Sequence, residues 1–72
     1  MSRGVMAFHP VKDCWVVELN NESYDLRCGE CSDLIIGSRR LPCRLELGLT
    51  WYVILESASL DLRTCETYQI CI

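Results

Sequence analysis

Apolar and polar residues alternate over short segments along most of this chain. In the clearest segment, residues 41–47, every second side chain is apolar: Leu41, Cys43, Leu45 and Leu47. A β-strand directs alternate side chains to opposite faces, whereas a helix would scatter these four positions around its axis. The pattern therefore predicts a strand over residues 41–47 with one face buried.

Further segments share the strand pattern less cleanly, and turn residues bound most of them. They span residues 4–8, 14–19, 32–36, 51–56 and 67–72. Two connections, 37–40 and 48–50, have the length of hairpin loops, so the three strands that they join are predicted to form an antiparallel meander.

The other connections are turns of two kinds. Residues 20–23, with the sequence NNES, are rich in residue types that tolerate a left-handed backbone. Residues 57–65 form a longer connection with room for one helical turn, for which Ser59 or Asp61 would be the cap.

These elements predict the fold class all-β, as a small antiparallel SH3-like barrel of five to six short strands with at most one helical turn. Closure into a barrel would remove exposed sheet edges. The chain has 72 residues, which is enough for a single small β-barrel domain over residues 1–72. A chain of this length buries roughly 60% of the surface that its unfolded form exposes, so its core is small.

The net charge of −3 is concentrated in one segment. Residues 18–33 contain five carboxylates and one arginine, which gives 1 − 5 = −4: Glu18, Glu22, Asp25, Glu30 and Asp33 against Arg27. A nucleic-acid-binding domain is expected to carry a basic stripe, so this charge argues against a nucleic-acid ligand. The basic pair Arg39 and Arg40 is predicted at a hairpin tip, and the sequence leaves open whether it contacts nucleic acid.

Six cysteines raise the question of a metal or redox site. Cys28 and Cys31 have the spacing of half a zinc site, but a structural zinc ion commonly needs a second close pair, and none is present. A thioredoxin-like pair would precede a helix, whereas Cys31 leads into a predicted strand. We therefore expect a tight turn at Gly29 with Cys28 packed beneath it, and we assign no metal and no cofactor. Whether the two thiols bind metal or form a disulfide stays open.

No combination of residues predicts catalysis. The sequence contains no glycine-rich phosphate loop and no nucleophile elbow, and its single histidine, His9, has no evident partner. We therefore expect a protein that is not an enzyme. The N-terminus lacks a signal-peptide core, and the longest apolar run, residues 51–55, is too short to span a bilayer. A cytoplasmic protein without membrane contact is expected, with its thiols acting as small buried apolar groups.

Three short motifs, YDLRCGE, CRLE and WYV, occur here in that order. In this respect the chain resembles a domain-of-unknown-function family of small proteins from Gram-positive bacteria, phages and mobile elements. The resemblance covers residues 24–56, and it differs at Arg39 or Arg40, where such proteins often carry a tryptophan. It implies the mobile-element setting and supports the fold, but it implies no mechanism.

The predicted function is a non-enzymatic protein-binding module of phage or mobile-element origin. An anti-CRISPR-like inhibitor of a host defence system is one form that such a module would take. Its partner would be a host protein that processes nucleic acid or acts in defence, because the acidic segment would face a basic channel and compete with phosphate. Tyr24 and Tyr52 are expected to be exposed anchors. The candidate partner-binding residues are Glu22, Tyr24, Asp25, Glu30, Arg44, Glu46 and Tyr52.

Two alternatives remain. The first is a small nucleic-acid-binding SH3-like accessory domain, in which Arg39, Arg40, Arg44 and Tyr52 would contact the ligand. The second is a homodimer formed by pairing of open sheet edges across a two-fold axis. The sequence identifies neither the partner nor the oligomeric state.

Overall fold

The computed structural model describes residues 2–72, so Met1 of the predicted domain lies outside the described residues. The chain forms eight strands, and no helix occurs among the described residues. In chain order they are β1 (Arg3–His9), β2 (Cys14–Leu19), β3 (Glu22–Asp25), β4 (Cys31–Ile36), β5 (Arg39–Leu47), β6 (Trp51–Ile54), β7 (Ser59–Asp61) and β8 (Tyr68–Cys71). The predicted all-β class is confirmed.

All pairings are antiparallel and join the strands into one sheet with the order β3-β2-β1-β8-β4-β5-β6-β7. The sheet is open, because β3 and β7 are its two ends and do not pair with each other. The predicted closed SH3-like barrel is therefore not confirmed. The structure also has eight strands rather than the predicted five to six. The segment of β3 was predicted as part of a turn and the loop after it, and the segment of β7 as part of a connection with a possible helical turn.

The predicted meander is present as β4, β5 and β6. Gly37 makes the β4–β5 turn with a positive φ of 62°, which glycine adopts without steric cost. The predicted left-handed turn between β2 and β3 is also present, with φ values of 50° at Asn20 and 67° at Asn21. Local residue chemistry therefore sets these two hairpins.

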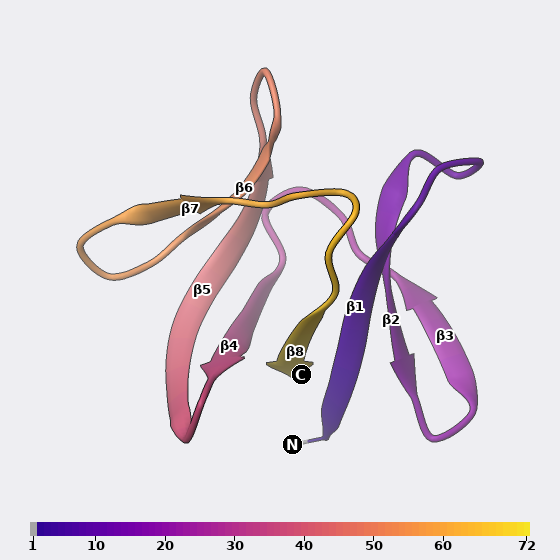
Figure 1. Cartoon of the computed structure of the whole chain (residues 1–72), viewed down its shortest axis with the longest axis horizontal. Helices are drawn as coiled ribbons and strands as arrows, with labels where there is room; N and C mark the ends of the chain where they lie inside the picture. Colours follow the sequence, from indigo (N-terminus) through magenta and orange to yellow (C-terminus); the bar gives the residue numbers. More distant parts are fainter. Residues whose placement is uncertain (1) are drawn as a thin grey trace.

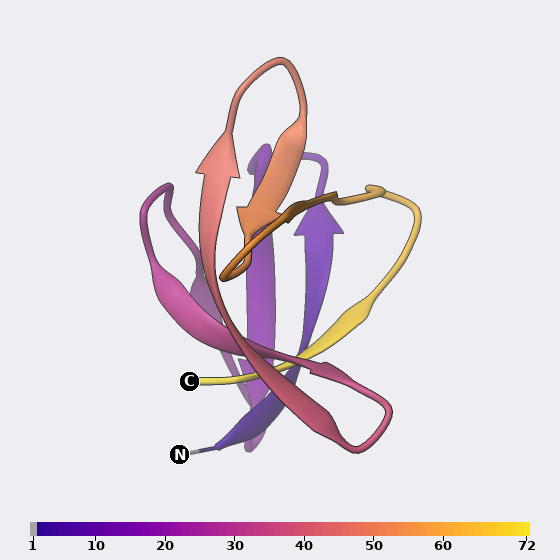
Figure 2. The same cartoon turned by 90° about the vertical axis from the view of Figure 1, so that its left-hand side faces the viewer.

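The sheet bends strongly, so that its inner face surrounds one core. Figure 1 shows β1, β2 and β3 on one side, β4, β5 and β6 on the other, and β8 between them, and Figure 2 shows these strands crossing at different angles, as in a bent sheet. The core includes side chains from nearly every strand: Met6, Trp15, Val17, Leu19, Leu26, Leu34, Cys43, Leu45, Val53, Leu62 and Ile70. Trp15 lies at its centre, fully buried and in edge-on contact with the rings of Phe8 and Tyr68.

Position 4 shows how closely β1 approaches β2. A Cβ atom at Gly4 would lie 2.6 Å from the carbonyl oxygen of Glu18, which is too close for any real side chain. Glycine at this position therefore allows β1 to pack against β2, and its lack of a Cβ is needed for space rather than for backbone freedom.

The cysteines only partly fill the core. Cys43 is buried as predicted and Cys71 is buried too, but Cys28 is exposed, which corrects the expectation that it packs beneath the turn at Gly29. Cys31 and Cys65 are exposed as well. Near this turn the core is formed instead by larger apolar side chains, since Leu26 and Leu45 are buried.

Among the described residues, no helix has the length and apolar character needed to cross a membrane.

Candidate functional site

The strand β3 forms one end of the sheet and is exposed along its whole length. It follows the Asn20–Asn21 turn and pairs with β2 so that Tyr24 lies opposite Val17 and Glu22 opposite Leu19. Ser23, predicted as the last residue of the turn, is in fact a strand residue between these two. Figure 1 shows β3 at the outer side of the sheet, with β2 as its one neighbouring strand.

Tyr24 and Glu22 interact directly on this strand. The Tyr24 hydroxyl donates a hydrogen bond to the Glu22 carboxylate. This hydrogen bond, and secondly the negative charge of Glu22, raise the pKa of Tyr24 above its ordinary value of 10.0. Tyr24 is 45% exposed, so it presents an apolar surface beside an acidic group.

The second acidic residue of β3 is paired. The Asp25 carboxylate lies 3.1 Å from the Lys12 ammonium group, and both side chains are about half exposed. The turn between β1 and β2 therefore reaches back to the end of β3. Glu18, on β2 opposite Ser23, is exposed and adds another carboxylate at this edge.

The other predicted site residues lie elsewhere in the sheet. Arg44 and Glu46 form an ion pair on β5, with 2.7 Å between Nε and Oε2, which answers whether they bond each other. Tyr52 lies opposite Glu46 and is half-buried, which corrects the expectation of an exposed anchor. Glu30 is next to β5 as well, because its carbonyl oxygen accepts a hydrogen bond from the Leu45 N–H at 2.9 Å.

The seven predicted residues therefore form two groups and not one site. Glu22, Tyr24 and Asp25 share the β3 edge, whereas the other four lie on or beside β5 and β6. In the sheet order, β2, β1, β8 and β4 stand between β3 and β5. The residues of the first group are also close in the sequence, whereas the second group is separated from them by the long-range strand order, on which sequence proximity gave no information.

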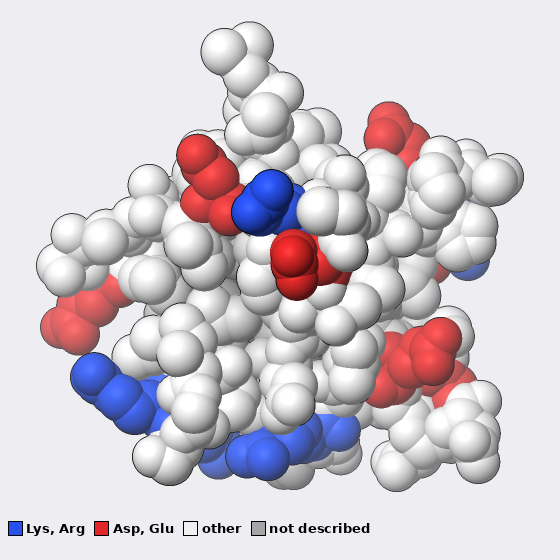
Figure 3. Space-filling view, viewed as in Figure 1, with Lys and Arg blue, Asp and Glu red and all other residues white. Residues whose placement is uncertain are grey.

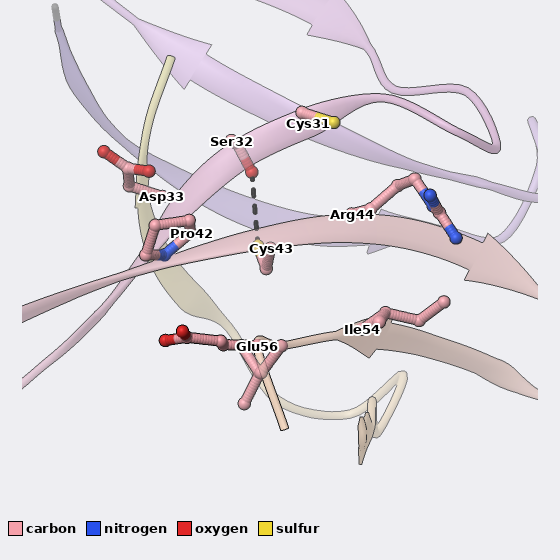
Figure 4. A pocket seen from close by; sticks show the side chains of 9 residues that line it. Cys31, Ser32, Asp33, Pro42, Cys43, Arg44, Ile54 and Glu56 are labelled. Atoms are coloured by element: carbon pink, nitrogen blue, oxygen red, sulfur yellow. Dashed lines mark hydrogen bonds between the residues drawn. The ribbon is translucent and has the colours of Figure 1, made fainter. Parts of the chain in front are cut away.

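The surface has a groove of about 760 Å³ along β4, β5 and the end of β6. Figure 4 shows the Ser32 hydroxyl pointing to the Cys43 thiol, with Oγ and Sγ 3.6 Å apart, and Asp33 and Glu56 at one end of the groove. Arg44 lies at the other end. The lining contains hydroxyl and thiol groups but no histidine that would act as their base.

The Cys14 thiol lies near His9 but is not activated as a nucleophile. Cys14, on β2, lies opposite His9 on β1. Burial raises the pKa of the Cys14 thiol, and the charge of Asp25 adds to this shift. The His9 Nδ1 atom accepts a hydrogen bond from the Lys12 backbone N–H at 3.2 Å. Within residues 2–72, no three side chains of the types His, Cys, Asp and Glu are grouped so that they hold a metal ion.

The arginines of the predicted nucleic-acid patch are partly neutralised. Arg40 forms an ion pair with Asp33 at 3.0 Å, across the β4–β5 hairpin, and Arg44 pairs with Glu46. Figure 3 shows basic groups along the lower margin and one near the top centre, with acidic groups around that one and at the left and right of this face.

Comparison with known proteins gives a family and a fold. The model of a family described as a domain of unknown function (DUF5348) matches residues 4–72, so the chain belongs to this family. The match bears out the predicted resemblance to a family of unknown function. No curated protein matches the chain significantly.

A solved structure is similar over nearly all of both chains. It is the crystal structure of a protein from Ruminococcus gnavus, a structural genomics target, with a TM-score of 0.81, covering 97% of this chain and 99% of that chain. The two sequences are 21% identical, so the similarity shows a shared fold.

Proposed function

We propose that this member of the DUF5348 family is a non-enzymatic protein-binding module that uses the β3 edge. The observation that supports this most is the open end of the sheet at β3, where all four residues are exposed and Tyr24 stands beside Glu22. An exposed sheet edge is a common recognition element, since a segment of another protein adds to it as a further strand.

The charge of the edge supports a basic partner. Glu18, Glu22 and Asp25 are exposed, and only Asp25 has an ion pair among the described residues. We propose that the partner is a host protein that processes nucleic acid or acts in defence, and that the acidic edge occupies its basic surface. In this proposal the module comes from a phage or mobile element and inhibits the host system in the manner of an anti-CRISPR protein.

The proposal extends to fold type and location. We regard the bent sheet as an open relative of the SH3-like barrel, which the single core enclosed by the sheet supports. We place the protein in the cytoplasm, which is supported by Cys43 and Cys71 serving as small buried apolar groups.

A charge-reversed pair of variants tests the protein-binding proposal. The variant with Glu18→Lys and Glu22→Lys changes the acidic edge, whereas Asp61→Lys with Glu66→Lys makes the same charge change at exposed positions elsewhere. Each variant is immobilised and used to capture proteins from a Gram-positive host lysate, and captured partners are purified and tested for direct binding by calorimetry. A nucleic-acid-processing or defence protein that binds the unchanged chain and the control variant, but not the edge variant, supports the proposal. Equal binding to both variants, or capture of no such protein, contradicts it.

A nucleic-acid ligand remains the second candidate, supported by Arg39 and Arg40 at the hairpin between β4 and β5. The ion pair between Arg40 and Asp33 reduces the charge available to phosphate. Fluorescence anisotropy with labelled single- and double-stranded DNA at low salt separates the two candidates. Binding that weakens steeply with ionic strength and is lost on Arg39→Ala would favour this second function.

A further inference from the structure

The backbone of β3 alternates between bonding to β2 and facing the open edge. Just beyond the strand, the Leu26 N–H donates to the Trp15 carbonyl oxygen at 2.8 Å, so these residues form a hydrogen-bonded pair of the antiparallel ladder. Such pairs recur at every second residue. Counting back along the observed register, Tyr24 and Glu22 are the β3 residues whose N–H and C=O groups bond to β2.

The alternation leaves Ser23 and Asp25 with backbone groups that point away from β2. Among the backbone hydrogen bonds of residues 2–72 outside the strand ladders, none uses the N–H or C=O of either residue. The edge therefore offers two donors and two acceptors with the spacing of one antiparallel ladder. A segment added here would form its hydrogen-bonded pairs with Ser23 and Asp25.

Side-chain specificity then comes from the other two positions. Residues opposite Glu22 and Tyr24 would form the non-hydrogen-bonded pairs, in which side chains of the two strands come closest, with Cα atoms about 4.5 Å apart. A lysine or arginine fits opposite the Glu22 carboxylate, and a β-branched or aromatic residue fits opposite the Tyr24 ring. The Tyr24 hydroxyl already bonds Glu22, so the two groups are held together before a partner arrives.

The same charges disfavour a second copy of this chain as the partner. In an antiparallel pair of two β3 strands, the outward-facing residues Ser23 and Asp25 must lie opposite outward-facing residues of the other copy. Each such register would bring the Glu22 and Asp25 carboxylates of both copies to one short ladder, and like charges that meet in a sheet are destabilising. The acidic edge therefore selects against itself and in favour of a basic strand.

We propose that β3 binds an extended, antiparallel segment with the order apolar residue, any residue, then lysine or arginine. The apolar residue faces Tyr24, the middle residue exchanges backbone hydrogen bonds with Ser23, and the basic residue faces Glu22. This assignment rests on the proposed protein-binding function and specifies the partner class of the same edge.

Synthetic peptides test the backbone register and the side-chain order separately. The probe is the capped peptide Gly-Thr-Val-Thr-Lys-Gly, titrated at millimolar concentration into the isotope-labelled full chain while amide shifts and hydrogen exchange are followed. In the expected complex the second threonine bonds to β3 through its N–H, whereas the valine N–H points away. N-methylation of that threonine is therefore expected to lower the affinity about tenfold, and N-methylation of the valine is expected to leave it nearly unchanged.

The exchange data and one chain variant complete the test. Binding is expected to slow the exchange of the Ser23 and Asp25 amides, which face the edge in the free chain. Ser23→Pro removes an outward N–H and is expected to lower the affinity about tenfold, whereas the matched Ser59→Pro at the start of β7 is expected to leave it nearly unchanged. Replacement of the peptide lysine by norleucine is expected to weaken binding.

Binding that tolerates both N-methyl groups would be electrostatic attraction alone and would overturn strand addition. No binding, or binding unaffected by Ser23→Pro, would overturn the assigned partner class. If the charge-reversal experiment still identified a partner that needs the edge, the protein-binding function would stand and only the strand-adding sequence would be wrong.

Discussion

Proline substitution along β3 gives the sharpest check on which backbone groups face the open edge. Proline removes one N–H, so its effect on stability depends on whether that N–H belongs to the ladder. At Ser23 the N–H faces the edge, and at Tyr24 it bonds to β2. To remove side-chain effects, Ser23→Pro is compared with Ser23→Ala, and Tyr24→Pro with Tyr24→Ala.

The expected magnitudes differ clearly. With 72 residues, the chain is expected to have a free energy of unfolding of roughly 4–11 kcal/mol. Tyr24→Pro leaves the Val17 carbonyl without its ladder donor and is expected to cost about 1–3 kcal/mol relative to Tyr24→Ala. Ser23→Pro loses no ladder bond and is expected to stay within about 0.5 kcal/mol of Ser23→Ala.

Urea unfolding followed by tryptophan fluorescence measures both differences, because Trp15 is fully buried on β2, beside β3. With a slope of about 1 kcal/mol per molar urea, the Tyr24→Pro midpoint should fall by about 1–3 M below that of its alanine reference. A larger loss for Ser23→Pro than for Tyr24→Pro would reverse the assignment of the ladder. The proposed strand addition would then lose its geometric basis.

Further predictions concern the core, the tyrosine and the thiols. Leu34→Ala should lower the free energy of unfolding by about 2–5 kcal/mol, because Leu34 is 1% exposed, whereas Leu49→Ala at a fully exposed loop position should change it by less than about 0.5 kcal/mol in the same urea assay. Glu22→Gln should lower the pKa of Tyr24 toward 10.0 in an ultraviolet titration. The raised pKa favours the protonated phenol in the folded chain, so the stability that it adds is present below pH 10.0. This stability is lost as the pH rises through the pKa of Tyr24 in the folded chain. The Glu22→Gln variant should lack this pH dependence of stability. With a thiol reagent, rapid reaction is expected at the exposed cysteines, Cys28, Cys31 and Cys65. Cys43 and Cys71 should react only as the chain unfolds, and rapid reaction of all six thiols in the folded chain would contradict the described burial.

The sequence pattern predicted those strands that have one buried face. On β5, Cys43 and Leu45 are buried and Arg44 is exposed, as the alternation indicates. The pattern failed for Leu47, which is 50% exposed although it shares their parity, because it lies at the end of the strand beyond the core. Hydrophobic periodicity indicates which side chains share one face of a strand. It does not indicate where along the strand that face extends beyond the core.

The candidate site was harder to predict for a related physical reason. All four residues of β3 are exposed, so no apolar period marks the segment as a strand, and Ser23 was assigned to the turn. Tyr24 and Tyr52 were both expected to be exposed, but Tyr52 lies on β6 between β5 and β7 and is half-buried. The two tyrosines differ in exposure because Tyr24 lies on the last strand of the sheet and Tyr52 on a strand with a neighbour on each side. This strand order depends on pairings between distant parts of the chain, such as β1 with β8.

The two ends of the open sheet differ in how well they suit the proposed strand addition. Each end presents unpaired backbone groups, which is a hazard that proteins limit with short strands or charges. At β7 the strand has three residues, which leaves little length for pairing. At β3 the strand has four residues, and in the proposed strand addition the carboxylates of Glu22 and Asp25 disfavour pairing with a second copy. In the proposed strand addition, a negative charge that repels an identical edge attracts a basic one, and Glu22 is the carboxylate that would face the basic residue of the added strand.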